Sequence, residues 1–215
     1  MVKFLREAWL RFEDPLAFLL RARSKLYSVW LSTTYPFVST GRKLSIQYPC
    51  MLRRPFASQI KLGSNVIIGK DTIIYIERDD VKDAKLVIED NCTIGPRSLI
   101  SAKNLIHIEQ DVMTGTSVLI QDHQHAHERE DLSIRAQGVT PGGRIRIERG
   151  CWIGQGAVIV CNGGQMVIGR NSVIGANSVV ARSLPPYSVI IGNPGIVVKG
   201  PAPKTPAPTG ELIEQ

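Results

Sequence analysis

Aromatic side chains, cysteines and long apolar runs are all scarce in this chain of 215 residues. Aromatic residues make up 6% of the chain, and no known nucleic-acid motif is present, so we expect no nucleic-acid partner. The four cysteines lack the spacing of a disulfide framework or a metal site, which favours a reducing, cytoplasmic compartment. No apolar run approaches the roughly 20 residues that a membrane-spanning helix needs, and no cleavable signal is evident.

Acidic residues are also in deficit, with 19 carboxylates against 26 lysines and arginines, a formal charge of +7 and a pI near 9.4. Many of the cations lie before residue 60, within or beside a segment at 1–35 that we predict to be helical, with a helix start at Pro15. This segment contains Trp9 and Trp30 next to basic residues. Two roles suit this segment. It can cap the open end of a sheet, and it can lie near the membrane at an anionic, inner-membrane surface; the two roles are compatible.

Branched aliphatics recur every six residues, which fits neither the period of a helix nor that of an ordinary strand. The period suits a chain wound as a triangular prism, in which each unit forms one flat side and three units form a coil. Buried, extended backbone favours β-branched side chains at the repeated position. The positions in phase include Leu62, Ile68, Ile74, Ile88, Ile94, Ile100, Ile120, Ile153, Ile159 and Ile174.

Small residues stand on either side of each repeated aliphatic. Two positions earlier the chain places a slim residue such as Val66, Cys92 or Cys151, which we expect to point into a narrow interior. Just after the aliphatic comes a glycine, which we expect because the chain must bend there and glycine tolerates unusual backbone angles. These glycines are Gly63, Gly69, Gly95, Gly115, Gly154, Gly169 and Gly175.

These units resemble the hexapeptide repeats of left-handed parallel β-helices over residues 60–120 and 145–200. The resemblance implies an all-β domain over 36–200, interrupted by a protruding loop at 121–144, with a weak period at 36–60 leading in. A Pro-rich stretch at 201–215 is expected to be a flexible tail. Most members of that family are trimeric acyltransferases, whereas a few are carbonic anhydrases or non-catalytic scaffolds.

Three of the four histidines lie within five residues at the start of the long loop, as Asp122-His123-Gln124-His125-Ala126-His127. Histidine is the side chain best suited to act as a general base near neutral pH. This loop start is similar to that of hexapeptide O-acetyltransferases acting on sugars, the galactoside and maltose enzymes among them. The resemblance makes His123 the catalytic base, and it continues through Gln137-Gly138, Trp152-Ile153-Gly154 and Asn193-Pro194.

The neighbours of His123 have less definite roles. We expect Asp122 and His125 to belong to the substrate site, with Asp122 also able to orient an imidazole, and His127 to be solvated. A zinc site built from His123, His125 and His107 is an alternative. It lacks the ligand pair five residues apart that carbonic anhydrases of this fold use.

The resemblance further implies that acetyl-coenzyme A lies in a groove between two subunits of a homotrimer. Small residues would let the cofactor approach the wall there, and Trp152 would line its thiol end. Arg182 and Lys199 match basic positions near the nucleotide phosphates. The expected cofactor site comprises Trp152, Gly154, Gln155, Gly175, Ala176, Ala181, Arg182 and Lys199.

We therefore expect an acetyltransferase that moves an acetyl group from acetyl-coenzyme A to a sugar hydroxyl, in synthesis of a surface polysaccharide such as O-antigen, capsule or exopolysaccharide. The alternatives are an N-acetyltransferase acting on an amino or nucleotide sugar, a γ-carbonic-anhydrase-like zinc enzyme, and a non-catalytic scaffold. The galactoside and maltose enzymes carry an asparagine and an aspartate that contact the acceptor. Neither is obvious between Gly95 and Lys103. We therefore expect either a different acceptor, such as a lipid-linked sugar, or an acceptor held by the N-terminal region or the 121–144 loop.

Overall fold

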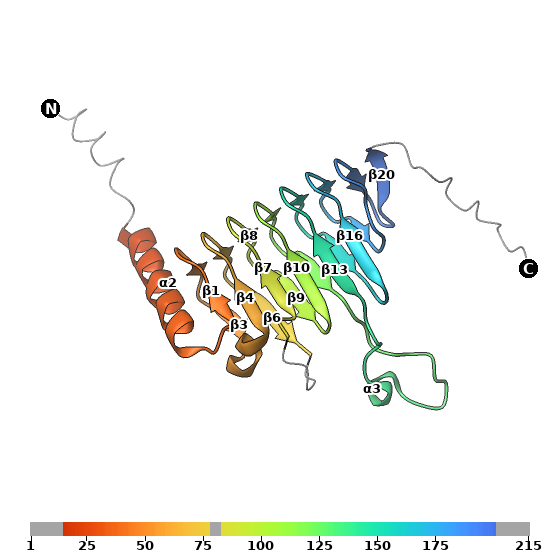
Figure 1. Ribbon diagram of the computed structural model, residues 1–215, viewed down its shortest axis with the longest axis horizontal. Coiled ribbons are helices and arrows are strands. Elements are labelled where there is room, and N and C mark those ends of the chain that lie inside the picture. The colour runs from red at the N-terminus through yellow and green to blue at the C-terminus, as the bar shows by residue number, and fades with distance from the viewer. Residues whose placement is uncertain (1–14, 78–82, 201–215) are drawn as a thin grey trace, which may run out of the picture.

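The computed structural model describes residues 15–77 and 83–200. Two sequence predictions lie partly or wholly outside these ranges: the helix before Pro15 with Trp9, and the Pro-rich tail. The described chain forms a β-solenoid, with helix α2 (Pro15–Thr34) at its N-terminal end and a long loop projecting from its side (Figure 1). The predicted all-β architecture is confirmed.

Three sheets form the faces of the solenoid, and every pairing is parallel except that of β19 with β20. Sheet A contains β1 (Ser39–Thr40), β4 (Ile60–Leu62), β7 (Leu86–Ile88), β10 (Leu105–Ile108), β13 (Arg144–Ile147) and β16 (Gln165–Ile168). Sheet B contains β2 (Ser45–Ile46), β5 (Ile67–Ile68), β8 (Thr93–Ile94), β11 (Met113–Thr114), β14 (Trp152–Ile153), β17 (Val173–Ile174), β19 (Val189–Ile191) and β20 (Ile196–Lys199). Sheet C contains β3 (Cys50–Leu52), β6 (Thr72–Ile76), β9 (Leu99–Ala102), β12 (Leu119–Gln121), β15 (Val158–Val160) and β18 (Val179–Val180).

From β1 to β18 the strands follow the chain in the order A, B, C, so each of these coils contributes one strand to each face; β19 and β20 then both join sheet B. The first coil is formed by β1, β2 and β3, which lie in the region where the six-residue period is weak. A 3₁₀ helix, η1 (Arg54–Gln59), and a four-residue helix in the long loop, α3 (Ile134–Gln137), were not predicted. Both fall where the six-residue period is broken, and they carry no periodic signal of their own.

The solenoid interior is filled by the repeated aliphatics, as the period predicts. Ile68, Ile94 and Ile153 are at most 1% exposed, and the slim residues two positions earlier, such as Cys92 and Ser172, are also buried. These slim residues often bond to a neighbouring coil: the Cys151 thiol, for instance, donates to the Gly169 carbonyl at 3.2 Å. Deleting the side chain of one such buried isoleucine costs roughly 2–5 kcal/mol.

The predicted reason for the repeated glycines is wrong. None of the seven has a positive φ; the left-handed residue instead lies two positions later, as in Asn65, Asn171 and Asn177. The glycines are required because successive coils nearly touch there: a Cβ on Gly95 would lie 2.0 Å from the Gly115 carbonyl oxygen. Close stacking, and not the bend itself, therefore explains the glycine in each repeat.

Helix α2 packs against β2 at the first coil. The Ser28 hydroxyl accepts a hydrogen bond from the Ile46 backbone N–H at 2.7 Å, Leu31 is fully buried, and the Tyr27 hydroxyl donates to the Cys50 carbonyl at 3.1 Å. One face of the helix thus covers the edge that the first coil would otherwise expose. Within the described ranges, no helix is both long and apolar enough to cross a bilayer.

Candidate active site

The long loop leaves the solenoid at the corner between sheets C and A, directly after β12. The Asp122 backbone N–H donates to the Ser101 carbonyl at 3.3 Å, and the returning Gly143 N–H donates to the Asp122 carbonyl at 2.6 Å. The two ends of the loop therefore meet at Asp122 and His123. Both side chains are buried, at 0% and 5% exposed.

The Asp122 carboxylate lies in a cradle of backbone donors. Its Oδ1 accepts from the Lys103 N–H at 2.7 Å, and its Oδ2 accepts from the N–H groups of Asn104 at 2.8 Å and Leu105 at 3.0 Å. Such donors compensate for burial of the charge. Because this carboxylate is fully enclosed in the chain, the structure favours the orienting role over substrate contact for Asp122.

The imidazole of His123 is held by that carboxylate, with Nδ1 lying 2.9 Å from Asp122 Oδ1. A hydrogen on Nδ1 makes Nε2 the proton acceptor of the neutral ring. Nε2 has no hydrogen-bond partner, yet within the described chain no buried side-chain nitrogen or oxygen lacks one. Nε2 must therefore reach the surface, where a substrate hydroxyl can meet it.

The other two loop histidines project away from this corner. The loop begins as a short antiparallel ladder, in which His125 pairs with Val139 and the Ala126 N–H donates to the Gly138 carbonyl at 3.0 Å. His125 and His127 are exposed, and His127 Nδ1 lies 3.4 Å from the His125 carbonyl. The structure thus separates both from the buried pair.

Three residues that the sequence did not single out fix the corner. Lys103 Nζ donates to the Thr140 carbonyl, and the Asn104 side-chain amide donates to the carbonyls of Pro141 at 2.9 Å and Gly143 at 3.1 Å. Gly142 has a φ of +77°, and a Cβ added there would lie 3.2 Å from His123 Cβ. Asn104 directly follows the segment 95–103, and its amide is already hydrogen-bonded to the loop.

The alternative zinc site is not assembled in the structure. His107 pairs instead with Glu89, whose Oε1 lies 2.7 Å from the His107 Nε2. In the described part of the chain, no three histidine, cysteine, aspartate or glutamate residues lie close enough to hold a metal ion. The four cysteines are all free and buried.

The residues predicted to bind the cofactor lie in two places. Trp152 is 53% exposed on sheet B, in one row of paired residues that runs through Val173 and Val189 to Lys199. Gln155 and Ala176 are exposed beside this row, just after β14 and β17. Ala181 and Arg182 instead follow β18, at the C–A corner that also carries His123.

The two predicted wall glycines have a structural reason of their own. A Cβ on Gly154 would lie 2.6 Å from the Ala176 nitrogen, and one on Gly175 would lie 2.8 Å from an Ile191 methyl. Close coil stacking therefore accounts for both glycines without a ligand. Arg182 is exposed and donates to the Gly195 carbonyl at 3.2 Å, and Lys199 is exposed on β20.

Sheet B and the C–A corner lie on opposite sides of the prism, with the apolar interior between them. Trp152 and His123 of one chain thus cannot face the same reacting group. A site containing both needs the corner of one subunit and the sheet B face of another, as in a heterologous contact that closes into a ring.

Comparison with known proteins agrees with this architecture. A family model described as the hexapeptide repeat of succinyl-transferase matches residues 85–113, 144–182 and 165–198. The putative lipopolysaccharide biosynthesis O-acetyl transferase WbbJ of Escherichia coli K12 is 25% identical over 160 residues, which are 72% of this chain and 77% of that protein.

A second relative is the galactoside O-acetyltransferase of Escherichia coli K12, 33% identical over 137 residues, which are 64% of this chain and 55% of that protein. The chain thus spans about half the length of that enzyme. The crystal structure of AntD, an N-acyltransferase from Bacillus cereus, matches 82% of this chain and 87% of its own, with a TM-score of 0.64 and 18% identity. The chain belongs to the hexapeptide-repeat family of acetyltransferases.

Proposed function

We propose that this protein transfers an acetyl group from acetyl-coenzyme A to a hydroxyl group of a sugar in a surface polysaccharide. The observation that carries the proposal is the geometry of His123, whose Nδ1 is held by the buried Asp122 and whose Nε2 reaches the surface. Support for the acceptor class comes from the relatives described as lipopolysaccharide and galactoside O-acetyltransferases.

In the proposed reaction, His123 Nε2 takes the proton from the acceptor hydroxyl as that oxygen attacks the thioester carbonyl. The C–S bond then breaks, the acetyl group stays on the acceptor oxygen, and the departing sulfur takes the proton back from the imidazolium. Asp122 holds the ring in the required tautomer and stabilises its positive charge while the proton is there. No covalent enzyme intermediate is needed.

We infer that the acyl donor lies between two subunits of a homotrimer. On sheet B, the exposed Trp152 and the half-buried Val173 and Val189 form a row that offers an apolar wall, and Lys199 at its end places a cation near the expected phosphates. The neighbouring subunit would supply His123 and Arg182 from its C–A corner. Small exposed residues such as Ala176 leave room for the donor's chain beside this row.

An amine acceptor is a second candidate, because the same base could deprotonate an amino sugar. AntD, whose fold is similar, is an N-acyltransferase. The test should therefore include sugars that carry free amino groups beside those that carry hydroxyls alone.

The decisive experiment measures release of the free thiol from acetyl-coenzyme A with such a panel of acceptors. We expect His123→Ala to lose roughly a hundredfold or more in kcat while still binding the donor. His127→Ala, in which an exposed histidine of the same loop is removed, is the matched control and should stay near wild type. Unchanged turnover in His123→Ala would refute the assignment of the base, and the acceptor that supports turnover would distinguish O- from N-transfer.

A further inference from the structure

Two adjoining depressions lie at the N-terminal end of the solenoid, where α2 meets the first coils. The first has a volume of about 570 Å³, and the second has a volume of about 530 Å³. Arg23 and Tyr48 line both, so the two are continuous. This end is several coils away from the corner that carries His123.

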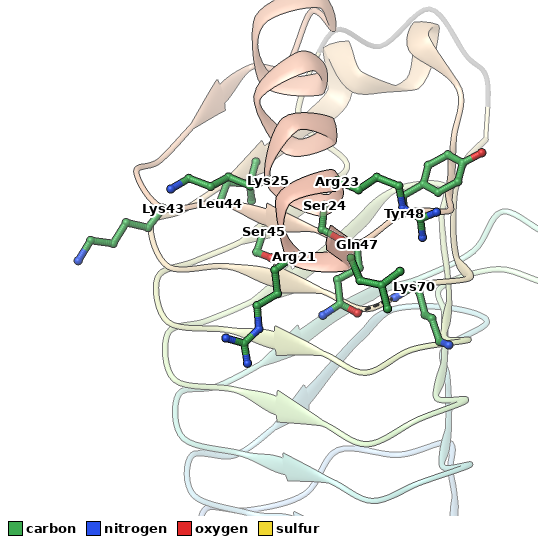
Figure 2. A pocket seen from close by; sticks show the side chains of 11 residues that line it. Arg21, Arg23, Ser24, Lys25, Lys43, Leu44, Ser45, Gln47, Tyr48 and Lys70 are labelled. Atoms are coloured by element: carbon green, nitrogen blue, oxygen red, sulfur yellow. Dashed lines mark hydrogen bonds between the residues drawn. The ribbon is translucent and has the colours of Figure 1, made fainter. Parts of the chain in front are cut away.

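The first depression is basic. Lys25 and Lys43 lie on one side of α2, and Arg23 and Lys70 lie on the other (Figure 2). None of the residues that line it is acidic. The Arg23 guanidinium lies 4.9 Å from the centre of the Tyr48 ring, in a cation–π contact between two residues that line the depression. Arg21 also lines the depression.

The second depression is apolar and is formed by the outer face of α2. Three large apolar side chains are exposed on this face: Leu26 at 72%, Leu19 at 60% and Trp30 at 51%. Large apolar side chains exposed side by side normally mark an interaction surface. The helix does not need this face for folding, because Ser28 and Leu31 on its other side already attach it to the solenoid. The solenoid therefore holds α2 with its apolar face toward the solvent.

We propose that this end of the molecule binds the surface of an anionic phospholipid bilayer. Phosphate headgroups would occupy the basic depression, and Leu19, Leu26 and Trp30 would enter the boundary between headgroups and acyl chains. Charge argues against a two-fold contact with a second copy of the chain at this end, because such a contact would place two clusters of cations against each other. A helix lying in the interface fits this surface without spanning the bilayer.

Flotation of the purified protein with lipid vesicles tests the proposal. We expect binding to vesicles of equal parts phosphatidylglycerol and phosphatidylcholine, weakened by salt, and little binding to phosphatidylcholine alone. The double variant Lys43→Gln/Lys70→Gln should bind the anionic vesicles roughly fivefold more weakly for each lysine removed. Lys61→Gln/Arg149→Gln removes the same charge from exposed residues outside both depressions and should bind as wild type does.

The apolar contribution is tested by Leu26→Ser/Trp30→Ser, which should also weaken vesicle binding while leaving turnover of a soluble acceptor unchanged. Equal binding by all variants would overturn the proposal, as would equal binding to neutral vesicles. Glycerol phosphate that binds in the basic depression without any vesicle binding would instead indicate a site for a soluble phosphate. Loss of subunit association in the Leu26→Ser/Trp30→Ser variant, with no vesicle binding by wild type, would assign the face to a second copy.

Discussion

Asp122 is a buried carboxylate that holds the imidazole of His123, the proposed base. Three backbone N–H groups stabilise its charge, and the same oxygen that faces Lys103 also faces the imidazole of His123. Because these backbone groups fix the carboxylate without help from His123, the imidazole is held by a rigid partner. Groups that orient a functional ligand in this way typically change its performance by 10- to 100-fold.

We predict that Asp122→Asn lowers kcat by roughly 10- to 100-fold and changes KM little, because the neutral amide stabilises the imidazolium less and no longer fixes the tautomer. The measurement is steady-state turnover together with the nitrogen chemical shifts of His123, which report the tautomer. A purely structural role would instead lower the unfolding temperature while the tautomer and kcat of the folded fraction stayed as in wild type.

Buried thiols make a separate prediction about pH. Burial raises the pKa of Cys92 and Cys151 from the ordinary 9.0 to about 11, against backbone hydrogen bonds that lower it. Since the folded-state pKa exceeds the unfolded one, the contribution of these thiols to stability is complete below pH 9 and is lost as the pH rises toward 11. The free energy of unfolding should therefore fall in this window.

We expect Cys92→Ser/Cys151→Ser to lose part of that alkaline fall, as measured by urea unfolding at pH 8.5 and at pH 10.5. Serine should fit, because Ser98, Ser172 and Ser178 occupy the same inward position in other six-residue repeats and are buried there. Tyrosines and lysines titrate in the same window, so the comparison is between the slopes of the variant and wild type. Identical slopes would contradict the prediction.

At the scale of elements, the strands follow from the sequence far better than the loop does. The six-residue period predicts which residues face inward because coil stacking imposes one rule on every repeat. The loop obeys no such rule, and the Asp122 cradle joins residues 17 to 19 positions apart in different coils. The role of Asn104 could not be predicted for the same reason, since its two acceptors lie 37 and 39 positions away.

The returning strand of the loop should control the position of His123. A Cβ at Gly142 would lie 2.8 Å from the Asp122 carbonyl oxygen and 3.2 Å from His123 Cβ, so Gly142→Ala should displace the base. We expect kcat to fall roughly 10- to 100-fold, since small misplacements of reacting groups cost about this much.

Gly138→Ala is the matched control for this change. Gly138 also has a positive φ, of +74°, but a Cβ there would meet nothing within 4 Å. It therefore carries a backbone penalty of the same kind without the contact. Steady-state kinetics should find Gly138→Ala close to wild type, and equal losses in both variants would show that loop strain, and not the contact with His123, is responsible.

For the whole molecule, the solenoid places the residues of the proposed site on two opposite sides of the prism. His123 could be identified from its place at the start of the loop, and Trp152 from its place in a repeat. Their separation onto opposite sides of the prism depends on which sheet each strand joins. The sheet of a strand can be predicted only by counting three strands per coil, and the irregular loop interrupts that count. The sequence therefore identified candidate residues but not which of them share a subunit.

The most direct test of the account is complementation between two inactive variants, His123→Ala and Trp152→Glu, the second of which places a negative charge where the anionic donor would lie. Each homotrimer should be inactive alone. Trimers assembled from an equal mixture should recover about a quarter of wild-type activity, because each site then draws its corner and its face independently from the two variants. Recovery no greater than the sum of the two separate activities would contradict a site shared between subunits.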